Sequence, residues 1–269
     1  MRGYPRNRLT ERPADEVVVT NTTQSRGYTI SYDDAGAGPA IVLLPGSTMS
    51  AADWRDAGYV DLLAPTHRVI STDPLGLGLS DKPHDPEAYR FPDVAADVIA
   101  VMDSAGIDRA VVWGYSRGGA LAGVIAVRYP DRVAAVILHA GGPEEVLKGS
   151  PPSEYAEAML RGDFALLWDG GAFTFSEDDR RYDREFNDPV AIGAMSIGPR
   201  RSGLSTDLGR VVAPALVIEG SKEADESKPF ALALGVELHV LPDCDHLDAF
   251  SRLDLVMPIV TGFLEPLGL

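Results

Sequence analysis

Short apolar runs alternate with helical periodicity along most of the chain. Residues 41–44, Ile-Val-Leu-Leu, are apolar at four consecutive positions, as in a strand that is covered on both faces. Residues 93–105 instead carry apolar side chains three and four positions apart, the spacing of an amphipathic helix. Because the two patterns follow one another repeatedly, the sequence predicts an α/β fold with a mostly parallel sheet and helices on both faces.

The same patterns assign elements to most of the chain. We predict strands over residues 17–22, 28–32, 40–44, 68–72, 110–114, 133–139, 215–219 and 236–241. We predict helices over residues 51–64, 93–105, 118–128 and 255–264. The first two strands are joined by a short polar turn that ends in Gly27, which favours a hairpin.

Three regions follow from this assignment. We expect residues 1–15 to form a mobile tail, and residues 16–142 and 209–269 to form the α/β core. Residues 143–208 lack a strand pattern and are rich in charged and aromatic side chains. A structureless loop of this length is unusual in a compact domain, so we expect a lid, or cap, of two or three helices. The alternative is a surface decoration with no role in binding.

A serine within a glycine-rich turn is the sharpest chemical signal. Residues 114–118 read G-x-S-x-G between a predicted strand and a predicted helix, with Ser116 at the centre. Such a turn points the hydroxyl out of the sheet, and the start of the next helix offers free N–H groups. We therefore predict that Ser116 is a nucleophile and that the N–H of Arg117 stabilises an oxyanion. The alternative is a turn that only packs a helix closely against a strand.

A serine nucleophile needs a base, and the chain has five histidines. His246 follows the last predicted strand, at the edge where a parallel sheet gathers its functional loops. We therefore predict His246 as the base. His139 ends an earlier strand, and we expect it to line the pocket or to lie behind the catalytic residues.

The base in turn needs a carboxylate that fixes its tautomer and stabilises the imidazolium. Several acidic residues lie in the loop after the strand at 215–219. Glu219 ends the strand and Glu226 begins the next helix, which leaves Glu223 and Asp225 as candidates. Composition alone does not choose between these two.

Three segments together resemble the α/β-hydrolase family, over about residues 17–265. They are the turn at 114–119, the stretch at 71–83 that reads STDPLGLGLSDKP, and the late pair Asp245-His246. The resemblance implies an eight-stranded, mostly parallel sheet with a small helical lid, and catalytic residues in the chain order serine, acid, histidine. In relatives the acid lies about three residues after the glycine that closes its strand. That position corresponds to Glu223, with Asp225 as the fallback.

The resemblance also implies a second oxyanion donor in the loop after the strand at 40–44. The backbone N–H of Ser47 occupies that position, and Gly46 is retained. The histidine that often precedes this glycine in relatives is replaced here by Pro45.

We expect an apolar substrate pocket around these residues, because ligand sites are mostly apolar. The residues that we assign to it are Gly46, Met49, Trp54, Tyr115, His139 and Trp168. Such a pocket favours a neutral, moderately hydrophobic ester or lactone, which would be cleaved through an acyl-enzyme. We expect no cofactor and no metal site.

Charge and cysteine content exclude several other classes. The 24 basic and 40 acidic residues give a net charge of −16, which disfavours binding to nucleic acid or to an anionic membrane. Cys244 is the only cysteine, so a disulfide framework is excluded. No signal-peptide pattern opens the chain, and we expect a cytoplasmic monomer or homodimer that acts on a small molecule.

Two other functions remain open from the sequence. A lyase, carbon–carbon bond hydrolase, cyclase or cofactor-free oxygenase of the same fold can use the same three catalytic residues. A binding module that senses a ligand without converting it is the second alternative.

Overall fold

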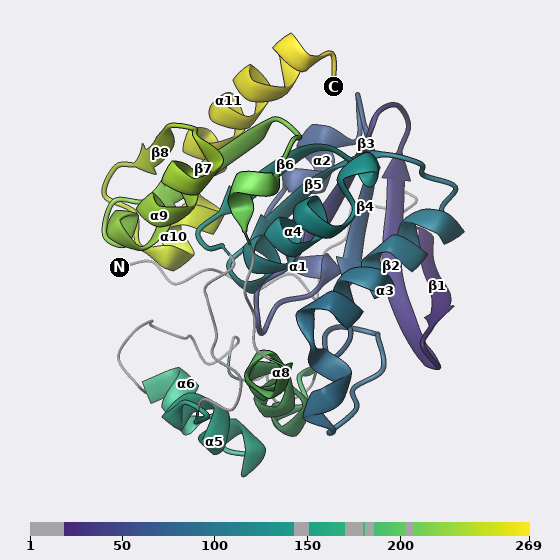
Figure 1. Ribbon diagram of the computed structural model, residues 1–269, viewed down its shortest axis with the longest axis vertical. Coiled ribbons are helices and arrows are strands. Elements are labelled where there is room, and N and C mark those ends of the chain that lie inside the picture. Colours follow the sequence, from purple (N-terminus) through teal and green to yellow (C-terminus); the bar gives the residue numbers. More distant parts are fainter. Residues whose placement is uncertain (1–18, 143–150, 170–179, 181–185, 203–206) are drawn as a thin grey trace.

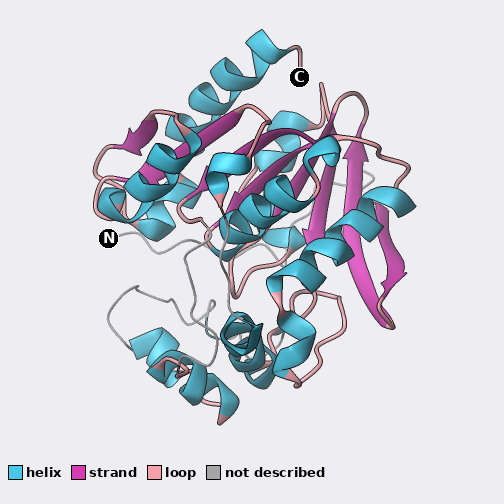
Figure 2. Cartoon of the chain, viewed as in Figure 1, coloured by secondary structure: helices cyan, strands magenta, loops and turns pink. Residues whose placement is uncertain are grey.

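The computed structural model describes residues 19–142, 151–169, 180, 186–202 and 207–269. Its centre is an eight-stranded sheet with the order β1-β2-β4-β3-β5-β6-β7-β8. The pairings β1–β2 and β2–β4 are antiparallel, and all the others are parallel. Helices cover both faces of this sheet (Figures 1 and 2). The predicted α/β fold with a mostly parallel sheet is confirmed.

The element bounds are as follows. The strands are β1 (Val19–Ser25), β2 (Tyr28–Gly36), β3 (Ala40–Leu44), β4 (Arg68–Asp73), β5 (Ala110–Tyr115), β6 (Val133–His139), β7 (Ala215–Gly220) and β8 (Leu238–Leu241). The helices of the core are α1 (Ala51–Asp56), α2 (Tyr59–Leu63), α3 (Phe91–Ser104), α4 (Arg117–Arg128), α9 (Ala224–Leu234), α10 (His246–Ser251) and α11 (Leu253–Leu264). Short 3₁₀ turns include η1 (Pro86–Tyr89) and η3 (Leu208–Arg210).

Two buried clusters of apolar residues lie on opposite faces of the sheet. One joins α3, α4 and η1 to the strands and includes Val42, Val112 and Val136. The other joins α1, α2, α10 and α11 to the opposite face and includes Ile41 and Val111. Consecutive strand residues thus face different clusters, which explains why the central strand β3 is apolar at every position.

One predicted helix differs from the structure in an informative way. The helix expected over 51–64 is two helices, α1 and α2, because Gly58 between them adopts a left-handed conformation with φ of 93°. A residue with that φ cannot continue an α-helix. Glycine adopts this conformation without the steric cost that a Cβ imposes.

Between β6 and β7 the described segments are helical. They form α5 (Glu154–Leu160), α6 (Ala165–Asp169) and α8 (Pro189–Ser202). The helix α8 packs against α5 and against η1 of the core, and the three helices lie together beyond one edge of the sheet (Figure 1). This agrees in kind with the expected cap, whose limits at 143 and 208 stay a prediction, and the tail predicted over 1–15 lies outside the described residues.

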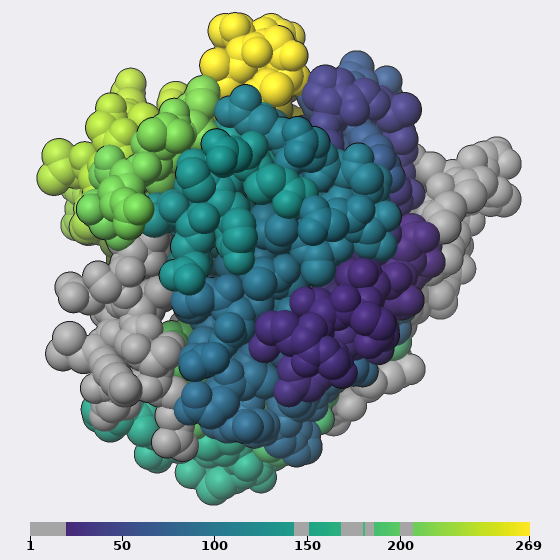
Figure 3. Space-filling view, turned by 45° about the vertical axis from the view of Figure 1, so that its right-hand side comes forward, coloured from purple at the N-terminus to yellow at the C-terminus, as the bar shows by residue number. Residues whose placement is uncertain are grey.

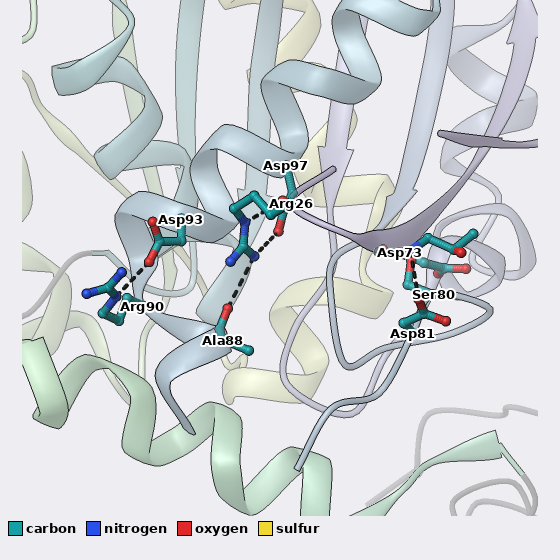
Figure 4. A network of polar contacts seen from close by, with 9 residues as sticks. Arg26, Asp73, Ser80, Asp81, Ala88, Arg90, Asp93 and Asp97 are labelled. Carbon is teal, nitrogen blue, oxygen red and sulfur yellow. Dashed lines mark hydrogen bonds and ion pairs between the residues drawn. The ribbon is translucent and has the colours of Figure 1, made fainter. Parts of the chain in front are cut away.

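The hairpin of β1 and β2 is fastened to the segment that begins α3. In the space-filling view the hairpin lies directly against the region of η1 and α3 (Figure 3). Arg26 in the hairpin turn binds the fully buried carboxylate of Asp97 on α3, with an N–O distance of 2.5 Å. Its guanidinium also donates to the carbonyl oxygen of Ala88 in η1 (Figure 4).

Among the described residues, no helix is both long and apolar enough to span a bilayer.

Candidate active site

Ser116 lies at a sharp turn between β5 and α4. Its backbone has φ of 55° and ψ of −122°, a combination that is strained for a residue with a Cβ. Tight packing around the turn maintains this conformation. A Cβ on Gly114 would lie 1.9 Å from the carbonyl oxygen of Gly118, and one on Gly118 would lie 2.1 Å from that of Leu44. Glycines at 114 and 118 are therefore required for the turn to form.

The structure brings His246 to this serine from the far end of the chain. His246 Nε2 lies 2.9 Å from the hydroxyl oxygen of Ser116. The histidine is the first residue of α10, and Asp245 caps that helix by accepting the N–H of Asp248. Because Asp248 in turn accepts the N–H of Asp245, the start of the helix is fixed by two reciprocal bonds. This geometry allows His246 to take a proton from Ser116.

Burial sets the protonation state of His246. It lowers the pKa of the imidazole below its ordinary value, while the nearby carboxylate of Asp245 acts in the opposite direction. Removing a charged ring from water is unfavourable, so the neutral form is preferred. Neutral imidazole is the form that acts as a general base.

Two residues behind the site hold α10 in place. The hydroxyl of Tyr115 donates to the carbonyl oxygen of His246 at 2.7 Å, and the two rings pack with centroids 5.2 Å apart. His139 Nε2 lies 3.0 Å from the carbonyl oxygen of Ala249, on the same helix. Burial lowers the pKa of His139 to about 3, so its ring is neutral and Nε2 is the donor. No pattern along the chain indicated either hydrogen bond, because each joins positions more than 100 residues apart.

Of the two residues expected to donate to an oxyanion, Arg117 directly follows Ser116, and Ser47 belongs to the loop that approaches it. Arg117 is the first residue of α4, where the N–H has no acceptor within the helix. Ser47 follows Gly46, and a Cβ on Gly46 would lie 3.3 Å from the Cβ of Ser116. Among the described residues, neither N–H donates to a backbone carbonyl. Their role in oxyanion binding stays a prediction.

The structure places the two candidate acids differently. Asp225 is exposed and binds Lys228. Glu223 has a buried Oε2 atom with no hydrogen bond, and neither acid is hydrogen-bonded to His246. Burial, and then the charge of Asp245, raise the pKa of Glu223. The loop that carries Glu223 does lie against the one that leads to His246, since Lys222 N donates to the carbonyl oxygen of Cys244.

The residues assigned to the pocket are not all near the serine. A Cβ on Gly46 would lie 3.1 Å from the sulfur of Met49, so both flank the turn that carries Ser116. Trp54, in contrast, is fully buried in the core, where its ring packs edge-on against Tyr59, Trp113 and Phe250.

Tyr115 and His139 are also buried, with exposed fractions of 2% and 0%. The structure places these two side chains and Trp54 in the packing behind the site rather than on an accessible wall. The sequence could not distinguish residues of the core from residues of the pocket wall, because both kinds are apolar. The side chain of Trp168 on α6 lies outside the described residues.

The loop after β4 is anchored next to the site by Asp73. Its carboxylate accepts the N–H groups of Ala51 and Leu79. Its carbonyl oxygen accepts the hydroxyl of Ser80 (Figure 4). A Cβ on Gly78 would lie 2.1 Å from this carboxylate, which explains the glycine. Burial raises the pKa of Asp73 to about 6. The residues of the 71–83 motif thus fix a loop and supply no group to Ser116.

Metal ligands do not gather in the described part of the chain. Within it, no group of three or more His, Cys, Asp or Glu side chains could hold a metal ion. Cys244 is buried, and burial raises the pKa of its thiol.

Known proteins share this arrangement of strands and helices. The family model of the alpha/beta hydrolase fold matches residues 39–202. A 2-hydroxy-6-oxo-6-phenylhexa-2,4-dienoate hydrolase of Burkholderia cepacia is 29% identical, over 92% of this chain and 97% of its own. Epoxide hydrolase B of Mycobacterium tuberculosis is 36% identical, over 44% of this chain and 35% of its own. The solved enol-lactonase of Burkholderia xenovorans LB400 superposes with a TM-score of 0.73 at 24% identity, covering 91% of this chain and all of the other. The family model covers more than half of the chain, and the eight-stranded sheet agrees with it, so the protein belongs to the alpha/beta hydrolase family.

Proposed function

We propose that the protein is a serine-dependent hydrolase that cleaves an ester or a lactone through an acyl-enzyme. The observation that carries this proposal is the 2.9 Å separation between His246 Nε2 and the hydroxyl oxygen of Ser116. A serine hydroxyl becomes an effective nucleophile when a base within hydrogen-bond distance removes its proton. The strained turn and the capped helix α10 hold these two groups together before any substrate binds.

In the proposed cycle, His246 removes the proton of Ser116 as the oxygen attacks the substrate carbonyl. The N–H groups of Ser47 and Arg117 stabilise the oxyanion, each by about 3 kcal/mol in the transition state. His246 then donates the proton to the leaving alcohol, and an acyl-enzyme remains. Water attacks the acyl-enzyme with His246 again acting as base, which releases the acid and restores Ser116.

We assign the supporting carboxylate to Glu223. Its loop packs against the one that leads to His246, and its Oε2 atom is buried without a hydrogen bond. A buried carboxylate oxygen without a partner is unfavourable, so an imidazolium formed during the reaction would be a suitable partner. The alternative acid, Asp225, is exposed and already bound to Lys228.

Hydrolysis of p-nitrophenyl butyrate tests the nucleophile. We expect Ser116→Ala to lower kcat by about 1,000-fold or more, because the covalent step is lost. Ser104→Ala, a change of an exposed serine on α3, is the control and should leave kcat within twofold. Turnover by Ser116→Ala at the wild-type rate would contradict the proposal.

Comparison of two conservative variants tests the acid. Glu223→Gln removes the carboxylate that we assign to the support of His246, so kcat should fall at least tenfold, whereas Asp225→Asn should change it less than twofold. Equal and small losses in both variants would show that the acid lies elsewhere in the chain.

One relative supports a second candidate, hydrolysis of a carbon–carbon bond beside a ketone. The name of the Burkholderia cepacia relative specifies a 6-oxo-6-phenyl substrate, which is a ketone and not an ester, and the similarity extends over 92% of this chain. Incubation with that dienoate distinguishes the two. Its Ser116-dependent consumption, together with no turnover of p-nitrophenyl butyrate, would favour the second candidate.

A further inference from the structure

Arg117 carries a guanidinium for which the site so far gives no role. Its backbone N–H is assigned to oxyanion binding, but its side chain makes no hydrogen bond and no ion pair among the described residues. The guanidinium instead lies over the ring of Phe91, with Cζ 4.6 Å from the centroid. This contact is a cation–π interaction, and no acceptor among the described residues takes any of the five N–H donors.

Other partly buried arginines of this chain are treated differently. Arg26, Arg55 and Arg68 each bind an aspartate through a guanidinium N–H. Arg117 is likewise partly buried, and a partly buried cation commonly has an anionic partner within the protein. Arg117 differs from these three arginines, because it has no such partner among the described residues. It directly follows Ser116 in the sequence.

The surroundings of Arg117 are the boundary between core and cap. Its side chain borders a cavity of about 10 Å³, room for about one water molecule, together with Pro45, Phe91 and Met195 of α8. Among the described residues that line this cavity, Arg117 is the only charged one. Tyr89 and Tyr155 lie close enough to raise the pKa of its guanidinium, against the effect of burial. Burial lowers the pKa of Arg117 only to about 10, so the side chain remains a cation at neutral pH.

We propose that Arg117 binds a carboxylate of the substrate, and that this protein therefore selects esters or lactones whose acyl part carries a negative charge. A planar guanidinium with free N–H groups matches a carboxylate in a bidentate arrangement. This revises the neutral substrate expected from the sequence, and it rests on the proposed function for the carbonyl chemistry at Ser116.

A binding measurement tests the charge preference without requiring turnover. We would titrate the wild-type protein calorimetrically with 5-phenylpentanoate and with its uncharged amide. The acid should bind at least tenfold more tightly than the amide. Equal binding of the two, or no binding of the acid, would overturn the proposal.

Substitution then assigns the preference to this side chain. Arg117→Met keeps the backbone N–H and most of the apolar volume, and it should reduce the preference for the acid to below threefold. Arg117→Lys keeps the charge but not the planar geometry, so it should retain an intermediate preference. An unchanged preference in Arg117→Met would show that the carboxylate is bound elsewhere and would overturn the proposal. Circular dichroism establishes that each variant is folded.

A pair of matched esters gives a second readout. We expect the ratio of kcat/KM for mono-(4-nitrophenyl) glutarate to that for 4-nitrophenyl pentanoate to fall at least tenfold in Arg117→Met. If wild-type turnover depends on Ser116 but shows no preference for the charged ester, this inference fails while the proposed function stands. If turnover does not depend on Ser116, the proposed function fails while the calorimetric preference remains interpretable.

Discussion

At the scale of single residues, Gly118 shows how strictly the turn at Ser116 constrains its neighbours. Gly118→Ala should destabilise the protein by about 1–3 kcal/mol, because the new Cβ would lie 2.1 Å from the carbonyl oxygen of Leu44. Gly262 in α11 is a matched control, since a Cβ there has no heavy atom within 4 Å. Gly262→Ala should stabilise by about 0.5–1 kcal/mol through helix propensity. Urea unfolding measures both, and equal changes would contradict the steric argument.

The pH dependence of activity follows from the environment of His246. Burial lowers the pKa of this histidine, so its neutral, active form persists to a more acidic pH than for a solvated histidine. We expect kcat/KM to fall on the acid side with an apparent pKa below the usual value of about 6.5. A profile of p-nitrophenyl butyrate hydrolysis between about pH 4.5 and 8 measures it. An apparent pKa above 7 would mean that a nearby carboxylate raises the pKa of His246 by more than burial lowers it.

At the scale of elements, helix α10 is held by two buried tyrosines. Tyr115 donates to the carbonyl oxygen of His246, the first residue of the helix, and Tyr59 donates to that of Phe250, the fifth, each at 2.7 Å. Tyr115→Phe and Tyr59→Phe should each destabilise the protein by about 1–2 kcal/mol, because a buried carbonyl loses its donor.

Only one of these two bonds fixes the catalytic histidine. We therefore expect Tyr115→Phe to lower kcat about fivefold or more, and Tyr59→Phe to change it less than twofold. Thermal unfolding and steady-state hydrolysis separate the two effects. Equal losses of kcat would show that the whole helix, and not its first residue, sets the activity.

The elements also show which parts of this structure the sequence could predict. Strands such as β3 and β5 were predictable because every residue of β5, and every residue of β3 except Ala40, is buried, which leaves a continuous apolar run. The serine turn was predictable because its glycines have a steric cause that is local in sequence. The break at Gly58 was missed because α1 and α2 have compatible apolar patterns and only a backbone angle separates them.

The pocket was harder to predict for a different reason. Trp54 and Met49 are both apolar, lie five positions apart and belong to the same buried cluster, and of the two it is Met49 that lies beside Gly46 at the serine turn. The choice between them depends on tertiary packing, which short-range periodicity does not encode. The lack of an ion-pair partner for Arg117 among the described residues could not be predicted for the same reason, since the partners of a charged residue depend on the three-dimensional structure.

At the scale of the whole molecule, the ion pair between Arg26 and Asp97 ties the outer hairpin to the helix layer. Asp97 is fully buried, so Arg26→Met would leave a carboxylate without its partner inside the protein. We expect a loss of about 3 kcal/mol in the free energy of unfolding, since breaking a buried pair on one side is costly. Arg252→Met removes a solvent-exposed pair with Asp254, and it should leave the free energy of unfolding almost unchanged.

A double variant identifies the source of that loss. If the cost of Arg26→Met comes from the stranded carboxylate, then Arg26→Met combined with Asp97→Leu should recover much of it, because no buried charge remains. If the cost instead comes from the lost bond to the carbonyl oxygen of Ala88, the second substitution should recover nothing. Urea unfolding of the four proteins of this cycle decides between the two. Recovery would mean that the hairpin is held chiefly by apolar packing against α3, with the ion pair selecting its position.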